Sequence, residues 1–145
     1  MKSVYNHPYF WNSAKIFNFY ANLSDFIEAP GNASKRVHLR LERNKSKVFS
    51  HSWDIEISPM LVQNIEKYKE YRYKTIRGLL RVIRNKGRHF TELPNDVKCL
   101  FGTFPDGFIS YFVCTFPCLL MVSHYSASCA ASDVMFKEFY SADVI

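Results

Sequence analysis

The sequence predicts a single all-α domain, and three observations support this fold class. Apolar side chains recur at three- and four-residue intervals in several segments, whereas the period-2 alternation typical of a β-strand is not sustained over any useful length. No internal repeat is present. The length of 145 residues allows one hydrophobic core but not two. Because aromatic residues make up 17% of the chain, we expect rings to fill much of that core.

The first half of the chain contains two segments with helical spacing. One runs from Phe10 to Ile27 and is followed by Ala29-Pro30-Gly31, a sequence that ends a helix. The other runs from Trp53 to Tyr73, and Pro59 suits a first helical turn better than a helix interior. Between them, residues 32–52 are dominated by Lys and Arg, so we expect a mobile basic loop with a short helix inside it.

The second half predicts several shorter helices. Thr75 is expected to cap a helix from Ile76 to Asn85, which Gly87 would end. A short helix is expected after Leu93-Pro94, and Pro105-Asp106-Gly107 is typical of a turn. Residues 133–145 have mixed character and are expected either to pack or to fray.

An apolar block follows that turn and raises the question of a membrane span. Residues 107–132 contain no Asp, Glu, Lys or Arg, and about 20 such residues are enough to cross a bilayer. However, Ser110, Pro117 and His124 interrupt the block. Two buried helices that break near Phe116-Pro117 explain the same residues, so no membrane span is predicted. A membrane-associated fragment is the alternative.

The composition limits the partners and the cofactors. A net charge of +6 and a pI near 9.2 favour an anionic partner, either nucleic acid or an acidic membrane surface. The first eleven residues have no apolar run suited to a signal peptide, which predicts a cytoplasmic protein. Without a C-x-x-C motif or a zinc-finger His pair, we expect neither a metal nor another cofactor. The cysteines are expected to be buried free thiols: Cys99, Cys114, Cys118 and Cys129.

The segment from Tyr71 to His89 carries most of the chemistry. At about 100° per residue, a helix would align Arg77, Arg81, Arg84 and Arg88 in one stripe and place Ile76, Leu79, Leu80 and Ile83 on a separate face. We therefore expect one face to pack on the core and the other to present guanidinium groups. A solvated basic helix explains the stripe equally well.

The residues around the stripe favour phosphodiester chemistry. Arginine binds phosphate through two parallel hydrogen bonds, and Asn85 can bond a phosphate oxygen or a base edge. His89 is the side chain that most easily gives and takes a proton near pH 7.

Several motifs occur in order along most of the chain. They are His7-Pro-Tyr-Phe-Trp11, Trp53-Asp54, the block from Tyr68 to Pro94, Pro105-Asp-Gly-Phe108, and Tyr111-Phe112 followed by Phe116-Pro-x-Leu-Leu120. Together they resemble the KEN (kinase-extension nuclease) domain family, which includes the inositol-requiring enzymes and ribonuclease L. The resemblance implies a leader at residues 1–6, a compact helical KEN-type ribonuclease domain at 7–125 that includes the basic loop at 32–52, and a tail at 126–145.

The same resemblance implies an activity and a setting. Members of the family are metal-independent endoribonucleases that act as dimers on stem-loop RNA and leave a 2′,3′-cyclic phosphate and a 5′-hydroxyl. We therefore expect this protein to bind RNA and to form a homodimer, or a heterodimer with a KEN-containing relative. Its expected role is mRNA processing in the unfolded protein response, at the cytosolic face of the endoplasmic reticulum if it belongs to a longer chain.

By position, the resemblance implies roles for four residues. Tyr71 and His89 would form the acid/base pair, with His89 as general acid, and Arg84 and Asn85 would bind the phosphate. A tyrosine, with an ordinary pKa of about 10, is a poor base unless cations lower that pKa, so positioning of the phosphate is an equal alternative for Tyr71. The expected RNA-binding residues are Lys74, Arg77, Arg81, Lys86 and Arg88.

The sequence departs from the family pattern at two glycines and in the kinase that precedes the nuclease domain in the family. Gly78 lies inside a helix, where glycine costs about 1 kcal/mol relative to alanine. Gly87 precedes His89 by two residues and could change how the imidazole is presented. No kinase sequence precedes the first motif. The alternative function is therefore a catalytically weak or inactive module that binds RNA or dimerises with a full-length relative.

Overall fold

The computed structural model describes residues 7–68 and 71–140, and these residues form helices and turns with no strand. The all-α prediction is confirmed. The α-helices are α1 Ser13–Glu28, α2 Asn32–Arg43, α3 Pro59–Tyr68, α4 Ile76–Arg88, α5 Asn95–Phe101, α6 Asp106–Thr115, α7 Leu119–Ala127 and α8 Lys137–Tyr140. Short 3-10 helices lie at Pro8–Phe10, Lys45–Lys47, Trp53–Glu56, Phe90–Glu92 and Ser128–Ala130.

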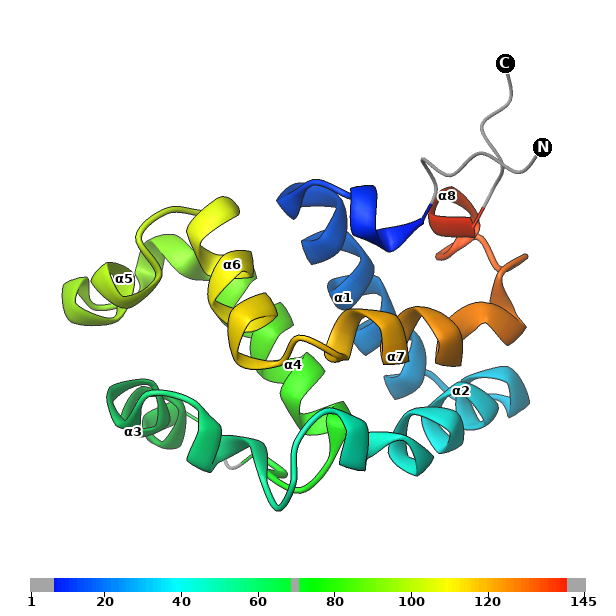
Figure 1. Ribbon diagram of the computed structural model, residues 1–145, viewed down its shortest axis with the longest axis horizontal. Helices are drawn as coiled ribbons and strands as arrows, with labels where there is room; N and C mark the ends of the chain where they lie inside the picture. Colours follow the sequence, from blue (N-terminus) through cyan, green and yellow to red (C-terminus); the bar gives the residue numbers. More distant parts are fainter. Residues whose placement is uncertain (1–6, 69–70, 141–145) are drawn as a thin grey trace.

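Helices α1 and α4 pack against each other through the middle of the molecule (Figure 1). On one side α2 packs on α7, and on the other α3 packs on α5, while α6 lies against α1. The apolar face predicted for α4 is confirmed, because Ile76, Leu79, Leu80 and Ile83 are all fully buried. Helix α1 carries an equally buried set that includes Phe19 and Leu23, and both helices contribute to one hydrophobic core. This central pair fixes the position of every α4 side chain discussed below.

Helix α1 has the local signals of a well-defined helix. The side chain of Asn12 accepts a hydrogen bond from the backbone N–H of Lys15 at 2.8 Å, which caps the N-terminus. The helix ends before Pro30, as predicted. It starts three residues later than the apolar spacing indicates, because Phe10 belongs to a preceding 3-10 helix.

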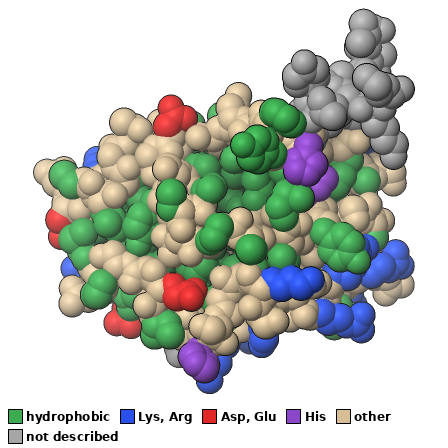
Figure 2. Space-filling view, in the orientation of Figure 1, with side chains coloured by type: hydrophobic (Ala, Val, Ile, Leu, Met, Phe, Trp, Pro, Cys, Tyr) green, Lys and Arg blue, Asp and Glu red, His purple; other side chains and the backbone are tan. Residues whose placement is uncertain are grey.

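Helix α2 corrects the prediction of a basic loop. It is a regular helix of 12 residues in which Val37 and Leu41, four residues apart, are fully buried. This narrow apolar stripe is concealed in the sequence by the basic residues between its members. On the face shown in Figure 2, Lys and Arg side chains gather toward the lower right, over α2.

The predicted helix from Trp53 to Tyr73 is interrupted. Trp53 lies in a 3-10 helix, and its buried indole N–H donates to the backbone oxygen of Arg72 at 3.0 Å. Helix α3 then begins at Pro59, which confirms the first-turn position of that proline. Residues 69 and 70 lie outside the described part of the chain.

Helix α4 begins as predicted but ends later. The hydroxyl of Thr75 accepts a hydrogen bond from the N–H of Gly78 at 3.0 Å, which confirms the cap. A Cβ on Gly78 would lie 2.1 Å from the backbone oxygen of Arg72, so the residue must be glycine in this arrangement. Gly87 does not end the helix, which continues to Arg88. A Cβ added to Gly87 would lie 2.1 Å from the ring of Phe17, so this glycine lets α1 and α4 approach closely.

The apolar block folds as two helices, α6 and α7, as predicted. Their axes bend by 93° at the break, and no single helix of the described residues is long and apolar enough to span a membrane, although the bent pair passes that test together. Phe108, Phe112 and Phe116 are buried, and they occupy the inner face. The four cysteines fall on other faces and are exposed free thiols, which corrects the expectation of burial.

Candidate active site

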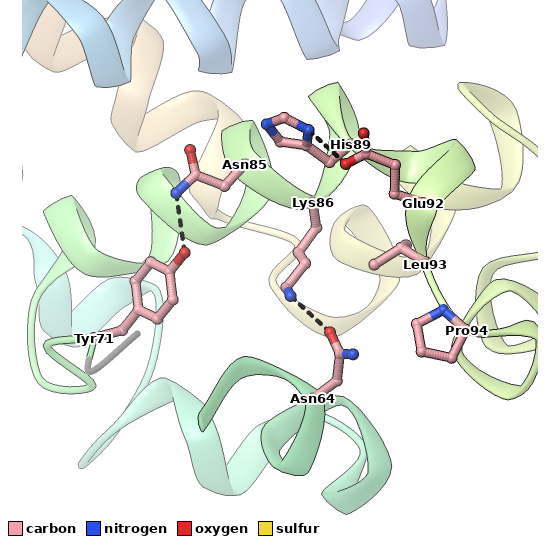
Figure 3. A pocket seen from close by; sticks show the side chains of 8 residues that line it. All are labelled: Asn64, Tyr71, Asn85, Lys86, His89, Glu92, Leu93 and Pro94. Atoms are coloured by element: carbon pink, nitrogen blue, oxygen red, sulfur yellow. Dashed lines mark hydrogen bonds and ion pairs between the residues drawn. The ribbon is translucent and has the colours of Figure 1, made fainter. Parts of the chain in front are cut away.

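A cavity of about 510 Å³ lies beside the C-terminal half of α4 (Figure 3). Asn85, Lys86 and His89 line it from α4 and its C-terminal cap, because His89 follows Lys86 by three positions and Asn85 by four, and such positions share a helix face. Tyr71 enters from the segment before α4, and Asn64 enters from α3. The remaining wall follows the 3-10 helix after His89 and is formed by Glu92, Leu93 and Pro94.

Three of the expected site residues form a chain of hydrogen bonds. The amide Nδ2 of Asn85 donates to the phenol oxygen of Tyr71 at 2.9 Å, and Nε of Arg84 donates to Oδ1 of Asn85 at 3.1 Å. The Tyr71 ring is almost fully buried. Because its oxygen accepts the bond from Asn85, the hydroxyl proton of Tyr71 is free to point at a group in the cavity.

Arg84 does not line the cavity itself but is held against α1. Its NH1 donates to Oδ1 of Asp25 at 2.6 Å, and NH2 of Arg88 donates to Oδ2 of the same carboxylate at 2.7 Å. Burial acts to raise the pKa of Asp25, but the hydrogen bonds and charges of Arg88 and Arg84 outweigh it and bring that pKa below its ordinary value. Asp25 therefore fixes the guanidinium that orients Asn85.

The predicted arginine stripe exists, but most of it is not presented to a partner. Arg77 donates through Nε to Oε1 of Glu28 at 3.0 Å and through NH2 to Oε2, and this hydrogen bonding lowers the pKa of Glu28. Arg84 and Arg88 both pair with Asp25. Three of the four guanidinium groups of the stripe therefore form ion pairs with acids of α1. The expectation of a free guanidinium face is corrected, because two acids three residues apart on α1 lie opposite it.

His89 caps the C-terminus of α4 and stays largely exposed. Its Nδ1 lies 2.8 Å from Oε2 of Glu92, a contact drawn in Figure 3. Glu92 is three residues along the chain, in the 3-10 helix that follows. A carboxylate at Nδ1 fixes the ring and leaves Nε2 on the opposite side as the atom that can exchange a proton with a substrate.

Lys86 lies in the cavity wall and is almost fully buried. Its Nζ donates to Oδ1 of Asn64 at 2.6 Å, and only 7% of the residue is exposed. Burial lowers the pKa of this lysine. Among the other expected RNA-binding residues, Lys74 is exposed in the loop before α4, and Arg77 and Arg81 line a second, smaller cavity that also touches Tyr71.

The sequence interpretation missed three residues that organise the site. Glu92 had a usable signal, since it follows His89 by three positions in a short turn. Asp25 had a weaker one, because it shares a helix face with Glu28 and α1 carries no other acid near its C-terminus. Asn64 had none: its burial opposite Lys86 depends on how α3 packs. Among the described residues, no group of three His, Cys, Asp or Glu side chains could hold a metal ion.

The fold and the site together define an all-helical domain with an imidazole, a phenol and an amide in one cavity. The family profile described as Ribonuclease 2-5A matches residues 16–140, so the chain belongs to this family and is a KEN domain. The serine/threonine-protein kinase/endoribonuclease ire-1 of Caenorhabditis elegans is 35% identical over 142 residues, which cover 98% of this chain and 15% of the worm protein.

Two further relatives have the same combined name. Serine/threonine-protein kinase/endoribonuclease IRE2 of Homo sapiens is 36% identical over 140 residues, which cover 97% of this chain and 15% of the human protein. The IRE1a protein of Arabidopsis thaliana is 37% identical over 142 residues, which cover 96% of this chain and 17% of the plant protein. The chain thus spans about a sixth of these relatives and is homologous to their endoribonuclease region.

Proposed function

We propose that this domain is an endoribonuclease that cleaves stem-loop RNA without a metal ion and leaves 2′,3′-cyclic phosphate and 5′-hydroxyl ends. The observation that carries the proposal is the meeting of Tyr71, Asn85 and His89 in one open cavity. These side chains bring a proton-exchanging imidazole, a phenol and an amide to the same cavity. Arg84 adds positive charge directly behind the amide.

In the proposed reaction the 2′-oxygen of the RNA attacks phosphorus and the bond to the 5′-oxygen breaks. Protonated His89 gives a proton from Nε2 to the departing 5′-oxygen, while the Glu92 carboxylate at Nδ1 stabilises the charged ring. Tyr71 lies where it can accept the 2′-hydroxyl proton or hold a phosphate oxygen. The pH dependence of a Tyr71→Phe variant separates these roles. If Tyr71 is the base, the cleavage rate of the unmodified protein should rise toward alkaline pH and the variant should lose that rise. If Tyr71 only holds the phosphate, the variant should keep it.

Arg84 and Asn85 are proposed to stabilise the charge on phosphorus. Asn85 uses one amide N–H on Tyr71 and retains a second for a phosphate oxygen. Arg84 uses NH1 on Asp25 and Nε on Asn85, so it acts on the phosphate through its positive charge and through the amide that it holds. Both side chains are therefore held in place before the substrate arrives.

The proposal includes a setting and an assembly. One relative, 38% identical over 136 residues, is the sensor for unfolded proteins in the ER ire1 of Schizosaccharomyces pombe. We place this domain in the same response, as an mRNA-processing nuclease that works as a dimer in the cytoplasm or on the cytosolic face of the endoplasmic reticulum. The alternative is a module that binds RNA or a KEN-containing relative without turnover.

The test is cleavage of a hairpin RNA in EDTA at increasing protein concentration. We expect a rate that curves upward with concentration, products with cyclic-phosphate ends, and loss of cleavage in His89→Ala. His51→Ala is the matched control, because His51 is exposed and lies outside both cavities. RNA binding without cleavage would support the inactive module instead, and cleavage that survives His89→Ala would refute the assigned chemistry.

A further inference from the structure

The second cavity, of about 170 Å³, lies beside the N-terminal half of α4. Its lining consists of Glu28, Tyr71, Arg72, Arg77, Gly78 and Arg81. Three of these are arginines and one is a carboxylate, so the lining that the structure describes is cationic. Tyr71 is the residue that the two cavities share.

Ion pairing inside this cavity leaves two arginines for a ligand. Glu28 is fully engaged by Arg77, which uses both Nε and NH2 on its two carboxylate oxygens. The Nε of Arg81 is buried, and its N–H donates no hydrogen bond to any of the described residues. Arg72 is exposed, and no carboxylate among the described residues pairs with it. A buried guanidinium N–H without an acceptor is unfavourable, and an anionic oxygen would satisfy it.

The backbone that carries Arg72 is fixed in advance. Its carbonyl oxygen accepts the indole N–H of Trp53 at 3.0 Å and the hydroxyl of Thr75 at 3.3 Å. The missing side chain of Gly78 lets this carbonyl lie against α4. The cavity is thus a built feature of the fold, formed by a held loop on one side and by the α4 stripe on the other.

We propose that this cavity is a subsite for a second RNA phosphate, adjacent in the strand to the phosphate that is cleaved, with Arg81 and Arg72 as its ligands. The inference rests on the proposed function. A strand whose reactive phosphate lies against the hydroxyl of Tyr71 passes over that ring, and its neighbouring phosphate then enters the smaller cavity. A guanidinium fork matches the oxygens of a phosphodiester in two parallel hydrogen bonds. The cavity is too small to take a base together with its sugar.

The subsite is tested by binding, so that the result does not depend on cleavage. The probe is a fluorescent hairpin RNA with 2′-O-methyl groups throughout the loop and one neutral methylphosphonate moved through the loop phosphates. In the unmodified protein, one methylphosphonate position should weaken binding about three- to tenfold. Arg81→Gln should weaken binding by a similar factor and reduce the slope of log affinity against log salt by about 0.7. In that variant, the same methylphosphonate should cost nothing further.

Two more variants keep the test decisive. Arg72→Gln changes an exposed loop residue, so the fold should be intact, and it should show the same coupling to the same phosphate. Lys137→Gln removes one charge from exposed α8, outside both cavities, and should show no coupling to any single phosphate.

The outcomes separate this inference from the proposed function. Coupling at one phosphate without any cleavage by the protein would support the subsite and overturn the nuclease proposal. Cleavage that is normal in Arg81→Gln and Arg72→Gln, with additive methylphosphonate effects, would overturn the subsite alone. Absence of RNA binding by the unmodified protein would also overturn it.

Discussion

Replacement of Asp25 by asparagine should weaken catalysis from a position outside the cavity. Asp25 accepts charge-assisted hydrogen bonds from Arg84 and Arg88, each of which is worth about 1.5–3 kcal/mol in a protected setting. Asp25 is 35% exposed and Arg88 47% exposed, whereas Arg84 is only 15% exposed, so the bond to Arg84 is the less screened. We expect Asp25→Asn to cost about 1–2 kcal/mol in free energy of unfolding, because one weaker acceptor remains.

The catalytic effect should be measured at a temperature at which the variant remains folded. A loosened Arg84 no longer holds Asn85, and through it Tyr71, so kcat should fall about tenfold with little change in KM. The measurement is hairpin cleavage together with thermal denaturation. Glu138→Gln is the matched control, since Glu138 is exposed on α8 and lies outside both cavities. In an Arg84→Ala background, Asp25→Asn should change kcat no further; a full additional tenfold loss there would refute the positioning role.

Three further predictions follow from the same geometry. Gly87→Ala should destabilise the fold by about 1–3 kcal/mol, because its Cβ would meet Phe17 at 2.1 Å, and Phe17→Leu in the same chain should restore part of the melting temperature; an unchanged melting temperature in the single variant would contradict the contact. Glu92→Gln should lower kcat about three- to tenfold with an unchanged KM in the cleavage assay. A rise in KM as large as the fall in kcat would argue against orientation of His89 by Glu92. Because the pKa of Asp25 is lowered by folding, its stabilisation is present above the unfolded pKa of about 3.9 and is lost as pH falls through the folded value, so denaturant melts of the parent and Asp25→Asn should differ at pH 7 and converge as pH falls below that folded value.

Helix α4 was the most predictable part of the fold because its signals are local. Thr75 caps it through a bond to a residue three positions on, and its apolar residues repeat at the spacing that buries one face. Helix α2 was less predictable. Its buried stripe has only Val37 and Leu41 at its centre. Besides the neighbouring α1, the helices that pack on α2 are α4 and α7, which lie far away in the sequence. Gly87 was misinterpreted for the same reason, since its neighbour Phe17 is seventy positions earlier.

The candidate site was predictable where residues act within one segment. Asn85, Lys86 and His89 lie close together at the C-terminal end of α4, and all three line the cavity. The partners of these residues come from other elements: Asn64 from α3 meets Lys86, and Asp25 from α1 meets Arg84. Such pairings depend on the rotation and offset of packed helices, which spacing within one helix does not determine.

The two acids of α1 divide the arginine stripe of α4 into three paired guanidinium groups and one that is not paired with them. A stripe of four arginines on α4 indicates four phosphate contacts, but Asp25 and Glu28 bind three of them and leave Arg81. If the paired arginines serve to shape the site, their replacement should alter folding stability and kcat with little effect on the salt dependence of RNA binding. Replacement of Arg81 should do the reverse. The salt dependence of binding therefore distinguishes arginines that hold the protein together from those that hold its substrate.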